Sequence, residues 1–120
     1  MKYMLLIYGN EEIWSSFTKE DFETLVRETD AHNAALFASG ELVGAYGVAD
    51  QVQAKTVRLR DGLPAVTDGP YLEAKEYIGS FYIVDCESLE RAIEIAAEMP
   101  SAKFKEIEIR PLMHEAGTEM

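Results

Sequence analysis

Two runs of the sequence, residues 1–8 and 78–85, would be apolar on both faces if each formed a β-strand. In the first run, the side chains that alternate along the strand are Tyr3, Leu5 and Ile7 on one face and Met4, Leu6 and Tyr8 on the other. A strand with two apolar faces needs cover on both sides. Both runs are therefore predicted to be central strands of a sheet.

Residues 104–110 show the opposite pattern, because Ile107 and Ile109 alternate with charged side chains. One-sided alternation is typical of a half-solvated edge strand, and we expect this run to lie at an edge of the sheet. Residues 42–48 predict a further strand, which Gly44 and Gly47 weaken.

Two helices are expected between these strands. Thr18 can cap the first, Phe17 can pack on Phe22 across the cap, and Gly40 ends the helix at about residue 39. Ser88 can cap the second, which Met99 and Pro100 end. The apolar stripe expected to face the core in the second helix consists of Leu89, Ala92, Ile93, Ala96 and Ala97.

The pair Asp61-Gly62 is a strong signal for a two-residue hairpin turn, and it separates residues 55–60 from residues 63–67. Such a turn places Arg58 and Arg60 on the hairpin face opposite Val57, Leu59 and Val66. Asp68-Gly69-Pro70 interrupts the second strand, and residues 71–77 read as a polar loop or a single helical turn.

The predicted fold class is α+β: a ferredoxin-like split βαβ unit with an antiparallel sheet and an inserted β-hairpin. Residues 1–113 form one domain, and residues 114–120 are expected to be a mobile tail. Two helices can cover only one face of the sheet. We therefore expect a homodimer that packs sheet to sheet, as in dimeric α/β barrels.

The charge balance limits the partners that this chain can bind. Eleven Lys and Arg residues against 22 Asp and Glu residues give a formal net charge of −11, which disfavours nucleic acid and anionic membrane surfaces. A single cysteine, Cys86, excludes an internal disulfide and a zinc site built on cysteines. The expected location is cytoplasmic, with no cofactor and no metal.

The segment Val66-Thr67-Asp68-Gly69-Pro70-Tyr71, with Glu73, Lys75, Glu76, Gly79 and Phe81 after it, resembles the YCII-related family. More narrowly, it is similar to the branch named for an Asp-Gly-Pro-Phe motif, with Tyr71 in place of the usual Phe. The resemblance extends from Met1 to about Pro111 and implies a dimeric α/β barrel. Members of the branch are often found near extracytoplasmic-function sigma factors. In the wider family a His and an Asp face a shared cleft, and that His would fall near Thr29, one turn before His32.

Two groups of residues are candidates for a site. The first is a polar turn within the apolar stripe of the first helix, where Thr29 and Asn33 would line a pocket and His32 would act as an acid or base. The structural alternative is that Thr29 bonds back to a carbonyl one turn earlier and that Asn33 secures a loop. The second group is the turn at Asp68, which either only shapes the chain or supplies a catalytic carboxylate.

Our first functional hypothesis is a dimeric barrel that binds a small molecule and carries out acid–base catalysis on it. Asp68 and His32 would be catalytic, and the residues that bind the substrate would be Arg58, Thr29, Asn33 and Glu73. The alternative is a non-catalytic accessory module that binds a protein partner, such as an extracytoplasmic-function sigma factor, through its acidic surface.

Overall fold

A four-stranded antiparallel sheet with the strand order β2-β5-β1-β6 forms the centre of the computed structural model, which describes residues 1–115. The strands are β1 (Lys2–Gly9), β2 (Leu42–Gly47), β5 (Tyr77–Asp85) and β6 (Ile107–Pro111). β1 and β5 occupy the two central positions and β6 lies at an edge, as their patterns predict. With a helix after β1 and another after β5, this is the ferredoxin-like arrangement.

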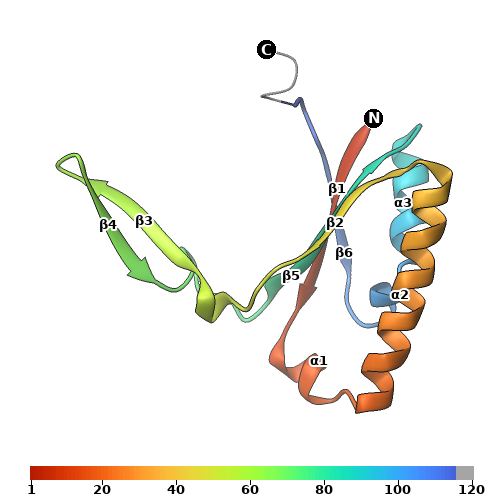
Figure 1. Ribbon diagram of the computed structural model, residues 1–120, viewed down its shortest axis with the longest axis horizontal. Helices are drawn as coiled ribbons and strands as arrows, with labels where there is room; N and C mark the ends of the chain where they lie inside the picture. The colour runs from red at the N-terminus through yellow and green to blue at the C-terminus, as the bar shows by residue number, and fades with distance from the viewer. Residues whose placement is uncertain (116–120) are drawn as a thin grey trace.

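Both long helices cover the same face of this sheet (Figure 1). They are α2 (Lys19–Ser39) and α3 (Leu89–Glu98). The buried cluster between the layers joins side chains of the sheet to Leu36 of α2 and to α3, and its sheet members are Tyr3, Leu5, Ile7, Tyr82 and Val84. No helix among residues 1–115 combines the length and the apolar character needed to cross a bilayer.

The start of α2 follows the predicted capping pattern. The Thr18 hydroxyl accepts a hydrogen bond from the Asp21 backbone N–H at 3.1 Å, and the Asp21 carboxylate accepts one from the Thr18 N–H at 2.8 Å. The rings of Phe17 and Phe22 lie 5.0 Å apart, which closes the turn on its apolar side. Gly40 ends the helix at φ 81°, a backbone conformation that glycine adopts without strain.

Three details differ from the expectations. In α3 the buried residues are Ala92, Ile95 and Ala96, whereas Leu89 and Ile93 of the predicted stripe are 43% and 51% exposed. β6 begins at Ile107 instead of residue 104, because Pro100–Lys103 forms a turn of 3-10 helix. A short helix, α1 (Glu11–Ser15), follows β1, and its cap Asn10 accepts a hydrogen bond from the Ile13 N–H.

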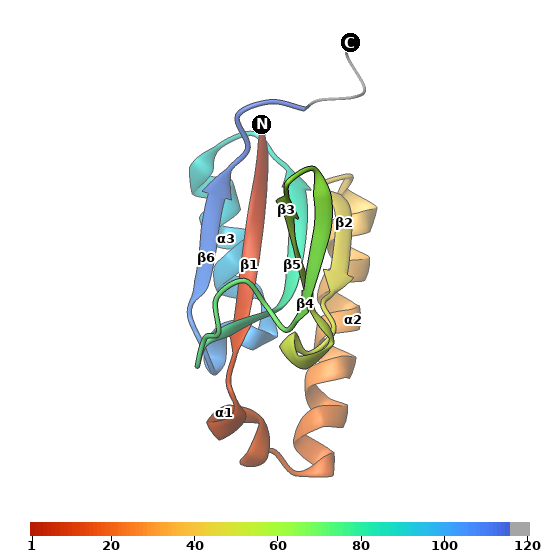
Figure 2. The ribbon, with the colours of Figure 1, turned by 90° about the vertical axis from the view of Figure 1, so that its left-hand side faces the viewer.

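The inserted hairpin consists of β3 (Lys55–Arg60) and β4 (Leu63–Asp68), and we call residues 55–68 the arm. Asp61 and Gly62 have φ values of 50° and 78°, which gives the predicted two-residue turn. The arm projects away from the sheet on the side opposite to the helices (Figures 1 and 2). The radius of gyration is accordingly 16.8 Å, against about 13.6 Å for a compact domain of this length.

Candidate functional site at the root of the arm

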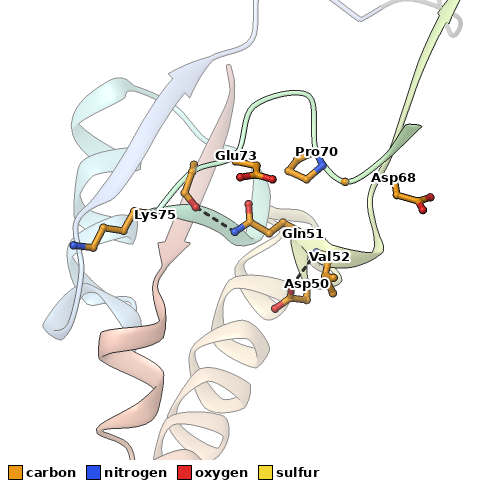
Figure 3. A pocket seen from close by; sticks show the side chains of 9 residues that line it. Asp50, Gln51, Val52, Asp68, Pro70, Glu73 and Lys75 are labelled. Carbon is orange, nitrogen blue, oxygen red and sulfur yellow. Dashed lines mark hydrogen bonds between the residues drawn. The ribbon is translucent and has the colours of Figure 1, made fainter. Parts of the chain in front are cut away.

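A cleft with a volume of about 690 Å³ lies where the arm joins the body. Three segments form it: the one-turn 3-10 helix η1 (Gln51–Gln53), the Asp-Gly-Pro turn after β4, and the loop that leads to β5. Figure 3 shows the residues that line it, which are Asp50, Gln51, Val52, Asp68, Gly69, Pro70, Glu73, Ala74 and Lys75. The sequence motif and the cleft therefore coincide.

The Asp-Gly-Pro turn is held by hydrogen bonds to the start of the first strand of the arm and to the residue before it. The Gly69 N–H donates to the Ala54 carbonyl at 2.8 Å, and the Thr56 hydroxyl donates to the Gly69 carbonyl at 2.9 Å. Gly69 has φ 96°, which side chains rarely tolerate. The backbone of the cleft wall is thus fixed by the protein itself.

Asp68 lies at the rim of the cleft, and its carboxylate points away from Glu73 and Gln51 (Figure 3). It pairs with the ammonium of Lys55, which the strand register places directly opposite. The sequence predicted Asp68 as a catalytic carboxylate and Arg58 as a substrate-binding residue, and the register keeps these two side chains apart. Arg58 pairs with Ala65 in the register and so lies on the other face of the arm.

The interior of the cleft contains residues that the sequence did not single out. The Gln51 side chain donates to the Ala74 carbonyl at 3.1 Å and links η1 to the loop of Glu73. The Asp50 carboxylate caps η1 by accepting from the Val52 N–H at 2.9 Å. An Asp residue two positions before the N–H that it caps can be recognised in the sequence. The neighbouring sequence does not show, however, that this cap faces the Asp-Gly-Pro motif about 20 residues later.

A polar clamp holds the far end of this loop against the body. The buried Asn10 amide donates to both carboxylate oxygens of Glu76 at 3.1 Å, and the Lys105 ammonium lies 3.0 Å from the same carboxylate. The hydrogen bond from Lys105 is the main reason why the pKa of Glu76 lies below its ordinary value. The loop between Pro70 and Tyr77 is therefore anchored at both ends.

The polar turn of α2 lies elsewhere, between the helix and the helix-covered face of the sheet. The Tyr82 hydroxyl donates a hydrogen bond to the Asn33 side-chain oxygen at 2.5 Å, so Asn33 ties α2 to the sheet and not to a loop. Thr29 and His32 lie on the same stretch of helix and are partly buried. Within one protomer the sheet separates these residues from Asp68 and Glu73, so the predicted set does not form one site.

His32 is the most unusual member of this group. Its side chain is 13% exposed, and neither ring nitrogen has a hydrogen-bond partner among the described residues. The nearest charge is the Glu98 carboxylate, 4.0 Å from Nε2. Burial lowers the pKa of His32, an effect that Glu98 opposes and Arg91 reinforces.

This burial predicts a loss of stability in mild acid. The pKa of His32 is lower in the folded than in the unfolded state. The neutral side chain therefore makes its full contribution to stability at pH values above the pKa of the unfolded state, which is near 6.5. That contribution decreases as the pH falls below this value. The free energy of unfolding of the native protein should drop between pH 7 and pH 5 more steeply than that of His32→Gln. Parallel urea titrations measure it, and equal slopes would contradict the prediction.

Groups typical of metal or thiol chemistry are not assembled here. Residues 1–115 contain no cluster of three or more His, Cys, Asp or Glu side chains suited to a metal ion. Cys86 is buried, and burial raises the pKa of its thiol. A thiol held protonated in this way is a weak nucleophile at neutral pH.

Comparisons with known proteins concern the whole domain. The family model of the YCII-related domain matches residues 1–115. An uncharacterized protein from Rhizobium meliloti is 32% identical over 114 residues, which cover 93% of this chain and 92% of that protein. A solved structure of 5-chloro-2-hydroxyhydroquinone dehydrochlorinase from Burkholderia phenoliruptrix, in complex with 2,5-dihydroxybenzoquinone, overlaps 96% of both chains with a TM-score of 0.49 and 15% identity. Similarity at that level does not support a shared activity.

Proposed function

The chain belongs to the YCII-related family, and we propose that it is a homodimeric protein that binds a small organic molecule in the cleft at the root of the arm. The observation that carries the proposal is the cleft itself. Its volume of about 690 Å³ lies within the range of roughly 300–1,000 Å³ that is usual for small-molecule sites. Its walls are held by hydrogen bonds before any ligand arrives.

The side chains of the cleft favour a neutral or cationic ligand. Glu73 points its carboxylate into the cleft and Asp50 adds a second one in its wall, against the single ammonium of Lys75 in the lining, whereas Asp68 is directed outward and paired with Lys55. Carboxylates accept hydrogen bonds from amines and hydroxyls and repel an anion. Val52 and Pro70 add apolar surface, which suits a small organic body that carries such groups.

Glu73 is the carboxylate best placed for acid–base work on a bound molecule. Its side chain points toward Gln51, within the cleft, whereas the Asp68 carboxylate is directed outward (Figure 3). A general base must reach the proton that it removes, within about 2.6–3.2 Å of the atom that holds it. We therefore assign proton transfer to Glu73 and a role in shaping the rim to Asp68.

The uncovered face of the sheet supports the proposed homodimer. The helices cover one face only (Figure 2), and the other carries the half-buried side chains of Met4, Phe81 and Ile83 with the more exposed Tyr46 beside Phe81. A contiguous apolar sheet face is typical of a surface that packs against another protein layer. A second copy presents the same face, so a two-fold symmetric dimer covers both at once.

The test is a thermal-shift screen of fragment-sized molecules grouped as anionic, neutral and cationic, with NMR mapping of each hit. We expect hits among the neutral and cationic groups, with shift changes at the amides of Gln51, Gly69 and Glu73. Loss of a charge-assisted hydrogen bond in Glu73→Gln should weaken a cationic hit about tenfold to hundredfold. Glu23→Gln, on the exposed surface of α2, is the matched control. Hits that map outside the cleft, or that tolerate Glu73→Gln, would count against the proposal.

A further inference from the structure

The arm presents an apolar face that nothing in its own protomer covers. The strand register pairs Val57 with Val66 and Leu59 with Pro64, so these four side chains lie on one face. Val57, Leu59 and Val66 are 62%, 71% and 59% exposed. No other helix or strand of residues 1–115 packs extensively against β3 or β4.

A two-stranded hairpin of this kind is marginally stable in water unless a third layer covers it. The chain exposes 8613 Å² of surface, about a third more than the roughly 6,500 Å² expected for a compact monomer of its mass. The excess is about 2,000 Å² and exceeds the approximately 800 Å² that each partner of a stable protein pair buries. The protomer therefore carries enough unused surface for an extensive interface.

The distribution of charge favours a second copy as the partner. The arm has three basic side chains, Lys55, Arg58 and Arg60, against two acidic ones, Asp61 and Asp68, for a net charge of +1. The whole chain carries −11, which leaves −12 for the remainder. Two bodies of this charge repel each other, whereas the arm of one copy is attracted to the body of the next.

We propose that the arm docks on a second copy of this chain, with the face of Val57, Leu59, Pro64 and Val66 against the uncovered sheet face of the partner. The match is chemical, since apolar arm residues meet an apolar sheet. By two-fold symmetry each copy gives one arm and receives one. The inference rests on the homodimer proposed above and names the element that holds it together.

Docking of the arm also bears on the cleft. One wall of the cleft lies at the root of the arm and consists of Val52, Asp68, Gly69 and Pro70. The angle of the arm therefore sets the shape of this wall. An arm held by a second copy fixes that wall, whereas a free arm lets it vary. A molecule that binds the cleft should therefore bind the dimer more tightly than the monomer.

The test compares two adjacent substitutions of equal charge on opposite faces of the arm, Val66→Asp and Thr67→Asp, by sedimentation velocity over a dilution series. Val66 and Thr67 are both exposed in the protomer, so neither change should unfold it, and circular dichroism checks this. The native protein should sediment as a dimer at micromolar concentration. Val66→Asp should raise the dimer dissociation constant at least tenfold, and Thr67→Asp should change it no more than about twofold.

Two outcomes overturn the inference and are distinguishable from each other. If Val66→Asp dimerises as well as Thr67→Asp, the arm does not dock, although the homodimer stands. If the native protein is a monomer at about 100 µM, a concentration at which even a weakly associating pair would dimerise, both the dimer and the docked arm are wrong. The ligand cleft is tested independently by the Glu73→Gln measurement.

Discussion

Replacing Ile95 with alanine should lower the free energy of unfolding by about 2–5 kcal/mol, the usual cost of truncating a fully buried aliphatic side chain. Ile95 is 0% exposed and lies in the core cluster between α3 and the sheet. Its neighbours on the helix, Ala92 and Ala96, are too small to fill the space that the lost atoms leave. Urea denaturation at a fixed protein concentration measures the change.

Ile93 provides a matched control on the same helix. It lies two residues earlier and is 51% exposed, so Ile93→Ala removes the same atoms from a half-solvated position. We expect a loss of less than about 1 kcal/mol there. The gain in helix propensity from Ile to Ala is common to both variants and cancels in the comparison. A larger loss at Ile93 than at Ile95 would mean that α3 faces the sheet as the sequence stripe predicted.

The sequence located the elements of the fold because each boundary has a local cause. Apolar runs on both faces marked β1 and β5 as central, Thr18 and Gly40 marked the ends of α2, and Asp61-Gly62 marked the turn of the arm. The face of α3 could not be read in the same way. Apolar residues surround more than half of that helix, so the sheet that it meets decides which of them are buried.

The candidate site was predictable only in part, for a similar reason. The Asp-Gly-Pro motif announced a turn, and Asp68 and Glu73 do line the cleft that this turn helps to form. The opposite wall comes from Asp50 and Gln51, whose approach depends on how the chain returns from the arm. The distance between Asp68 and His32 is likewise a property of topology, because the arm and α2 lie on different sides of the sheet (Figure 1).

Asn33 and Tyr82 show why a polar turn in an apolar stripe need not be a site. Tyr82 is buried on the sheet, and its hydroxyl is paired with the Asn33 oxygen at 2.5 Å. Burial is the main reason why the pKa of this phenol is raised, so the group stays protonated and can donate. One internal hydrogen bond thus satisfies both polar groups where helix and sheet meet.

A double-mutant cycle tests this structural role. Tyr82→Phe should lower the free energy of unfolding by about 1–3 kcal/mol, because it leaves the Asn33 oxygen without its partner in a desolvated place. Asn33→Leu should cost a similar amount, since the Tyr82 hydroxyl then loses its acceptor. The double variant puts two apolar groups of similar shape in contact and should recover most of the loss, because neither polar group remains. Additive losses in the double variant would show that the pair is not coupled, and the hydrogen bond would then not explain why Asn33 occupies the apolar stripe.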